Sequence, residues 1–147
     1  MLVWIHGGGF TSGSGSSRLY GPEHLLDYNI ILITINFRVG PLSFLTMENN
    51  DMPGNLALHD QILALEWIQE YVEYFGGNPK KVTIGGISSG AVSVMYLLMT
   101  HLTKGLYSKA IIKSGPLISS YNFWDKNPHL YTKNIVEHLG MYYKKDI

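Results

Sequence analysis

The stretch Gly86-Ile87-Ser88-Ser89-Gly90 decides the interpretation of this sequence, because it stands between two different kinds of apolar segment. The run Val82-Thr83-Ile84 before it is typical of a β-strand, and residues 91–99 after it are typical of a helix. Glycines on either side of a serine allow a sharp, strained turn that exposes the hydroxyl at the end of a strand. The pattern therefore predicts a nucleophile elbow with Ser88 at its tip.

A second glycine run, His6-Gly7-Gly8-Gly9-Phe10, follows the apolar residues Leu2-Val3-Trp4-Ile5. Consecutive glycines can present several backbone N–H groups to one small volume, as an oxyanion hole requires. In acyl transfer, such donors stabilise the negative charge that develops on the attacked carbonyl oxygen. Each motif alone also occurs in ordinary turns, but the two together, each after a strand and in this order, favour a hydrolase.

Composition limits the alternative functions. The 147 residues suit one domain, and 46% hydrophobic residues with 12% aromatics indicate a chain that folds around a core. Eleven basic and eleven acidic side chains cancel, so the charge predicts neither nucleic acid nor an anionic membrane surface as a partner. No apolar run approaches the roughly 18 residues of a transmembrane helix, and Met1 leads directly into a strand rather than a signal segment. The sequence therefore predicts no particular cellular compartment.

Metal and thiol chemistry are not expected. The chain has no cysteine, which excludes a disulfide framework and thiolate metal sites. None of the six histidines has another histidine at the i, i+4 spacing of a helical metal site. We therefore expect neither a metal nor a cofactor.

The other apolar segments alternate between strand and helix patterns. Residues 30–35 form a continuous, largely β-branched run, which predicts a strand buried on both faces, and residues 110–112 predict another strand. A helix is expected over 55–75, ended by Gly76-Gly77-Asn78-Pro79. Its apolar face would be Leu58, Ile62, Leu65, Ile68 and Val72.

Three further helices are expected, over residues 22–28, 89–101 and 128–139. The second is apolar nearly all round and should be buried. Strands separated by helices predict an α/β fold, with a parallel sheet that has helices on both faces.

Longer motifs make the sequence recognisable. They are His6-Gly7-Gly8-Gly9-Phe10, Asn36-Phe37-Arg38-Val39-Gly40-Pro41-Leu42, Pro53-Gly54-Asn55, Asp60-Gln61, the run from Phe75 to Thr83, and Gly86-Ile87-Ser88-Ser89-Gly90-Ala91. In their order and spacing the chain resembles the type-B carboxylesterases, the family that includes the cholinesterases, and it is most similar to insect esterases. The resemblance extends from Leu2 to about Gly140 and implies the α/β-hydrolase fold.

The resemblance also implies a partial α/β-hydrolase domain over residues 1–147, truncated at both ends. Such esterases are several hundred residues long, and this chain resembles only the segment from the third to the sixth strand of their sheet. These strands are spatial neighbours in the order fourth, third, fifth, sixth, so residues 30–36 and 110–113 would form bare edges. Because exposed apolar edges favour aggregation, we expect the isolated chain to be poorly soluble or molten.

By resemblance, Ser88 is the nucleophile, and the backbone N–H groups of Gly8, Gly9 and Ser89 form the oxyanion hole. Relatives usually have alanine at position 89, but serine keeps the N–H that the hole requires. The implied reaction is two-step hydrolysis of a small carboxylic ester through an acyl-enzyme, without a cofactor. The triad acid and histidine come from later loops in the family, so we expect both to lie outside this chain and the isolated chain to be inactive.

After Ser88 the chain does offer side chains in the order serine, acid, histidine that this fold uses. They are Asp125, Glu137 and Asp146 as acids, and His101, His129 and His138 as bases. We reject them, because the family's acid and base follow later strands. Instead we expect His101 to end the elbow helix, where a cation suits the helix dipole, and the other two histidines to be solvated.

Several positions have only supporting roles or depart from the family. His6 is expected to support the shape of the glycine loop. Ile87 stands where relatives commonly carry a glutamate that influences the active-site histidine, which predicts altered activity with an intact covalent step.

Arg38 and Asp60 match structural positions, and the usual partner of the arginine lies upstream, which predicts a buried Arg38 without its partner. Tyr121 lies close to the position of an acyl-pocket tryptophan, and a surface tyrosine is the alternative.

Two other functions stay open. The family also contains non-catalytic adhesion proteins, which typically lack the nucleophilic serine, so the presence of Ser88 favours an enzyme. A truncated product without a function of its own is the other alternative. The ester is not identified, because most of the substrate pocket would lie outside this segment.

Overall fold

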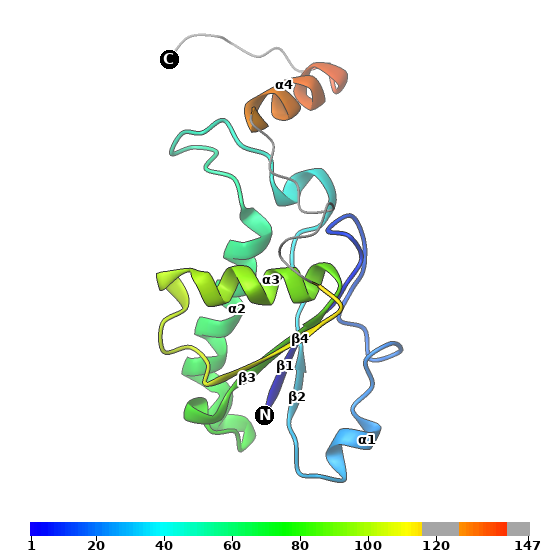
Figure 1. Cartoon of the computed structure of the whole chain (residues 1–147), viewed down its shortest axis with the longest axis vertical. Helices are drawn as coiled ribbons and strands as arrows, with labels where there is room; N and C mark the ends of the chain where they lie inside the picture. Colours follow the sequence, from blue (N-terminus) through cyan, green and yellow to red (C-terminus); the bar gives the residue numbers. More distant parts are fainter. Residues whose placement is uncertain (116–126, 141–147) are drawn as a thin grey trace.

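The computed structural model describes residues 1–115 and 127–140. Its centre is a four-stranded parallel sheet with the strand order β2-β1-β3-β4 (Figure 1). The strands are β1 (Leu2–Ile5), β2 (Leu32–Thr34), β3 (Thr83–Ile87) and β4 (Lys109–Lys113). This order is the one that the resemblance implied, and it places the end of β3, which carries the elbow, beside the end of β1, which leads into the glycine loop.

The helices match the predicted segments. They are α1 (Glu23–Leu26), α2 (Leu56–Tyr71), α3 (Ser89–Met99) and α4 (Pro128–His138), with the 3₁₀ turns η1 (Gly40–Ser43), η2 (Val72–Phe75), η3 (Pro79–Lys81) and η4 (His101–Thr103). The long helix predicted over 55–75 is α2 continued by η2. Gly76 ends it with a φ of 75°, a left-handed conformation that glycine adopts without steric cost.

The core lies between the sheet and two helices. Val3 and Ile5 of β1 are fully buried, whereas Leu2 and Trp4, which point to the opposite face, are only half-buried. The same buried cluster contains residues of both α2 and α3, among them Leu65 and Leu97. The two helices therefore cover one face of the sheet. Helices were expected on both faces, but in the described part of the chain only this face is covered by helices.

Burial of the outer elements differs from two expectations. Residues of β2 are half-buried rather than buried on both faces, because β2 is an edge strand. Helix α3 is buried over its first two turns, but its last turn exposes Leu98 and Met99. The other edge strand, β4, is exposed along its whole length, including 48% of Ile111 and 44% of Ile112. Within residues 1–115 and 127–140, β2 and β4 have no further strand beside them, as expected, and the poor solubility of the isolated chain stays a prediction.

Helix α4 packs away from the sheet, beside the segment that precedes α2 (Figure 1). The buried hydroxyl of Thr132 accepts a hydrogen bond from the backbone N–H of Thr46 at 2.9 Å and donates one to its carbonyl oxygen at 2.7 Å. On the surface, His129 Nδ1 lies 3.1 Å from a carboxylate oxygen of Glu48. These contacts attach α4 to the loop that follows η1.

Candidate functional site

The predicted elbow joins β3 to α3. Ser88 has a φ of 54° and a ψ of −125°, a combination that is strained for any residue other than glycine. Two backbone hydrogen bonds hold it there: its N–H donates to the Lys113 carbonyl, and its carbonyl accepts from the Val92 N–H, both at 3.0 Å. The side chain of Ser88 is exposed at this tip. The geometry is therefore that of a strained turn that presents a hydroxyl.

The flanking glycines are required because backbones meet at this place. A Cβ on Gly90 would overlap the carbonyl oxygens of Ile5 and His6, and a Cβ on Gly86 would overlap the backbone of Gly90. The start of α3 thus packs directly on the end of β1. A Cβ on Gly7 would stand 3.1 Å from the Cβ of Ser88, so the glycine loop begins in contact with the elbow.

The glycine loop itself is a tight left-handed turn. Gly8, Gly9 and Phe10 have φ values of 131°, 61° and 61°, and a Cβ on Gly8 would overlap the carbonyl oxygen of Ser12. Positive φ at both Gly9 and Phe10 is typical of a type I′ turn. Only glycine tolerates this geometry at position 8, and Phe10 is held in a conformation that a bulky residue rarely adopts.

The backbone N–H groups that were predicted to form the oxyanion hole are unpaired in the described part of the chain. Within the described residues, the backbone N–H groups of Gly8, Gly9 and Ser89 donate no hydrogen bond. Ser89 is the first residue of α3, where a helix has unpaired N–H groups and the positive end of its dipole. Its side-chain oxygen is buried without a hydrogen-bond partner among the described atoms.

The buried ring of His6 contacts the glycine loop, consistent with the supporting role expected for it. It is 1% exposed, and its ring stacks on Phe37 at a centroid distance of 4.4 Å and an interplanar angle of 14°. Its Nδ1 lies 2.8 Å from the Gly7 carbonyl oxygen, which requires a proton on that nitrogen. A Cβ on Gly13 would stand 2.5 Å from the same nitrogen, so the loop closes around the ring.

The structure corrects the prediction for Arg38. Its side chain is 44% exposed rather than buried, and it forms a bidentate ion pair with Asp60, with Nη2–Oδ1 at 2.6 Å and Nε–Oδ2 at 2.7 Å. The backbone N–H of Arg38 adds a third hydrogen bond to Asp60, at 2.9 Å. These hydrogen bonds lower the pKa of Asp60 more than its partial burial raises it. Helix α2 thus supplies the carboxylate that was expected from elsewhere.

None of the histidines in the described residues forms a hydrogen bond with Ser88. Four histidines are exposed to solvent: His24, His59, His101 and His138. His129 faces Glu48, and Glu137 is paired with Lys133 at 3.7 Å. Asp125, Asp146 and Tyr121 lie outside the described residues. Within the described residues, the site therefore contains an exposed serine and unpaired backbone N–H groups, and no histidine is hydrogen-bonded to that serine.

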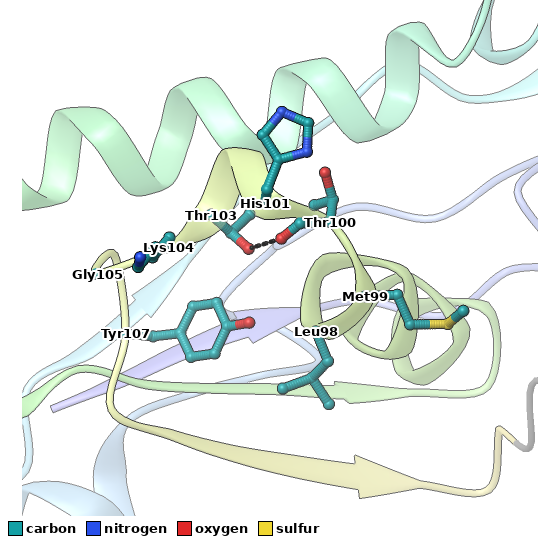
Figure 2. A pocket seen from close by; sticks show the side chains of 8 residues that line it. All are labelled: Leu98, Met99, Thr100, His101, Thr103, Lys104, Gly105 and Tyr107. Atoms are coloured by element: carbon teal, nitrogen blue, oxygen red, sulfur yellow. Dashed lines mark hydrogen bonds between the residues drawn. The ribbon is translucent and has the colours of Figure 1, made fainter.

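An open cavity of about 360 Å³ lies at the other end of α3 (Figure 2). It is lined by residues such as Leu98, Thr100 and Tyr107, and no residue of the elbow or the glycine loop takes part. The Tyr107 hydroxyl donates to the carbonyl of Leu97 at 3.0 Å, and Thr103 donates to the same carbonyl and to that of Thr100. These polar groups satisfy the end of a helix, which is a structural task.

Residues 1–115 and 127–140 contain no group of three or more histidine, aspartate or glutamate side chains placed to hold a metal ion. No helix there is long and apolar enough to cross a membrane.

Two features of the site escaped the sequence analysis. One is the partner of Arg38. The other is the set of groups that hold the Gly8 carbonyl: its oxygen accepts hydrogen bonds from the backbone N–H and the hydroxyl of both Thr11 and Ser12. A hydroxyl pair directly after a glycine turn was the available signal, since threonine and serine often bond nearby backbone groups.

Comparison with known proteins places this geometry in a family. The model of the carboxylesterase family matches residues 1–146. The chain is 44% identical over 143 residues to esterase FE4 of Myzus persicae, covering 95% of the chain and 24% of that esterase. It is also 44% identical over 123 residues to acetylcholinesterase-1 of Trittame loki, covering 83% of the chain and 22% of that protein.

A crystal structure agrees with the fold. Juvenile hormone esterase from Manduca sexta, with OTFP covalently attached, superposes with a TM-score of 0.92 and 37% sequence identity. The match covers 98% of this chain and 27% of that one. The described sheet and helices therefore have the α/β-hydrolase architecture, and the chain spans about a quarter of the length of the relatives it matches.

Proposed function

Because this chain belongs to the carboxylesterase family, we propose that the protein that contains it is a serine carboxylesterase. The observation that carries the proposal is the strained Ser88 turn, with the glycine loop in contact with it and three unpaired N–H groups nearby. A serine held at such a turn, beside preformed N–H donors, suits attack on a carbonyl group.

In the first step, the Ser88 oxygen forms a bond with the ester carbonyl carbon while a general base takes the hydroxyl proton. The carbonyl oxygen becomes an anion, which the N–H groups of Gly8, Gly9 and Ser89 stabilise. The bond to the alcohol oxygen then breaks, the base returns the proton to that oxygen, and the alcohol leaves. An acyl group remains bound to Ser88.

In the second step, water attacks the acyl carbon with the same base taking its proton. The tetrahedral intermediate uses the same oxyanion donors, and its collapse releases the carboxylic acid and the free Ser88 hydroxyl. The start of α3 contributes to both steps, because the positive end of its dipole favours the developing negative charge.

The general base and its acid are proposed to come from the part of the protein that this chain does not span. The proposed substrate is a small-molecule carboxylic ester, and neither nucleic acid nor a cofactor is needed for the reaction. Ile87, which follows Gly86 in the elbow, places an apolar side chain beside the nucleophile. We propose that this isoleucine, in place of the glutamate that relatives commonly carry, removes a negative charge near the active-site histidine and so changes the rate without preventing acylation.

The direct test is hydrolysis of a p-nitrophenyl ester series by the complete protein. Ser88→Ala should lower kcat by about four orders of magnitude or more, because the nucleophile is lost. Ser108→Ala is the matched control: its hydroxyl donates to the Val82 carbonyl, at 2.9 Å, in the turn before β4, and the variant should keep kcat within about twofold. Equal activity of wild type and Ser88→Ala would contradict the proposal.

A further inference from the structure

The carbonyl oxygen of Gly8 is an unusually crowded acceptor. It accepts from the backbone N–H groups of Thr11 and Ser12 at 3.0 and 3.2 Å. It also accepts from the Thr11 hydroxyl at 3.1 Å and, at a longer 3.4 Å, from the Ser12 hydroxyl. Four donors from one short segment therefore converge on a single oxygen.

This oxygen belongs to the same peptide group as the N–H of Gly9. A trans peptide is planar, so its C=O and N–H point in opposite directions. No residue of the described chain has a cis peptide bond. Fixing the Gly8 carbonyl toward Thr11 and Ser12 therefore turns the Gly9 N–H away from that segment, and rotation of the N–H requires the loss of the carbonyl's hydrogen bonds.

The same hydrogen bonds also make the N–H of Gly9 a stronger hydrogen-bond donor. Hydrogen bonds polarise one another along a chain, so a peptide whose oxygen accepts several bonds has a more polar N–H. Without such support, a turn with φ near 61° at both Gly9 and Phe10 could rotate its peptide planes at little cost to its glycines. Of the two side-chain hydrogen bonds to the Gly8 oxygen, the one from the Thr11 hydroxyl is shorter than the one from Ser12.

We propose that Thr11 is a positioning residue for the oxyanion hole: through the Gly8 carbonyl, its hydroxyl aims and polarises the N–H of Gly9. The inference rests on the proposed esterase function and deepens it, because it assigns a role to a side chain that does not touch the substrate. Ser12 gives weaker support to the same oxygen.

The test measures ester hydrolysis by the complete protein with three single variants. Thr11→Val keeps the shape and removes the donor, and it should lower kcat and kcat/KM equally, by about threefold to tenfold, with KM unchanged. Thr11→Ser keeps the hydroxyl and should restore wild-type rates. Thr100→Val is the matched control at the far end of α3 (Figure 2), where the hydroxyl oxygen accepts from the Leu102 N–H, and it should keep wild-type kcat.

A second readout separates positioning from simple loss of folded enzyme. A trifluoromethyl ketone labelled with ¹³C at its carbonyl adds to Ser88 as a hemiketal, whose ionisation NMR can follow. Thr11→Val should raise the pKa of that hemiketal, because its oxyanion is less stabilised. Partial unfolding would reduce the signal without moving the pKa.

The outcomes distinguish the two claims. Wild-type kcat and hemiketal pKa in Thr11→Val, or no rescue by Thr11→Ser, would overturn the role of Thr11 and leave the esterase intact. A wild-type protein that neither hydrolyses esters nor adds the ketone at Ser88 would overturn both the function and the inference.

Discussion

The two ends of α3 differ in how they are built. At its start, the backbones of β1, the glycine loop and the helix approach so closely that Gly90 and Gly8 leave no room for a Cβ. At its end, about 16 Å away for an 11-residue helix, there is an open cavity, and a Cβ on Gly105 would meet nothing within 4 Å.

We propose that the chemistry resides at the crowded end rather than at the hollow one. The crowded end holds the strained Ser88, the unpaired N–H groups and the positive end of the helix dipole. The hollow end uses Thr103 and Tyr107 to satisfy helix carbonyls. Backbone strain and close approach therefore indicate the site better than the size of a cavity.

The largest contrast should come from adding a methyl group at each end. Gly8→Ala places a Cβ into the Ser12 carbonyl at a φ of 131°, so the oxyanion loop must move, and kcat/KM should fall by on the order of 100-fold or more. Gly105→Ala, at a φ of 87° in open space, should keep kcat/KM within about twofold. Ester hydrolysis by both variants measures this, and equal losses would remove the distinction between the ends.

Stability should show the same contrast with a smaller effect. Gly90→Ala forces a Cβ against the carbonyl oxygens of Ile5 and His6, and this overpacking should cost about 1–3 kcal/mol of unfolding free energy. In Gly105→Ala the added Cβ has free space and only the positive φ is unfavourable, which should cost about 1 kcal/mol, the lower end of the penalty for a left-handed residue. Denaturant unfolding of the complete protein compares them. A Gly90→Ala variant as stable as Gly105→Ala would show that the backbone contact is not tight.

Two other regions, the Arg38–Asp60 pair and the second half of α3, should differ in pH dependence. Hydrogen bonds from Arg38 hold the pKa of Asp60 below its usual range, so the stability from this pair is present above about pH 3.9, the unfolded value, and is lost as pH falls through the lower folded pKa. Asp60→Asn should flatten the acid limb of a stability–pH profile. An unchanged acid limb would mean that the pair contributes nothing.

In the second half of α3, burial raises the pKa of Tyr96. Stability linked to this group is full below about pH 10, the unfolded value, and decreases as pH rises through the folded pKa. Tyr96→Phe should therefore flatten the alkaline limb and leave the acid limb unchanged. The same profile, recorded on both variants, assigns each limb to one region of the molecule.

The smallest effect is expected at the rim of the cavity. Met99 is 72% exposed in the last turn of α3, and Met99→Gln should change the unfolding free energy by no more than about 0.5 kcal/mol and leave kcat/KM unaltered. A large loss of activity would indicate that the hollow end takes part in the reaction after all.

The sequence was most informative where local geometry leaves few choices. Glycine runs after strands predicted both the Ser88 turn and the loop at Gly8 and Gly9, because positive φ and close approach select glycine. Helical spacing likewise predicted α2, and glycine at position 76 predicted its end. The strand order followed from family resemblance, since local patterns do not specify which strands are neighbours.

Features that depend on contacts between segments far apart in the sequence were harder to predict. The partner of Arg38 is Asp60, 22 residues away, and a charge pattern does not show which carboxylate a fold brings near. Residues 30–35 looked fully buried, but burial of a strand depends on its neighbours, and β2 lies at an edge. The hydrogen bonds to the Gly8 carbonyl depend on how the loop folds back on itself, which the sequence pattern does not specify.

The central claim is that Ser88 is a nucleophile, and covalent labelling tests it most directly. The complete protein is treated with an active-site phosphonate ester, digested, and analysed by mass spectrometry. We expect one phosphonyl group per protein, on the peptide that contains Ser88, and no label in Ser88→Ala. A wild-type protein that stays unlabelled, or that carries the label on another residue, would contradict the assignment.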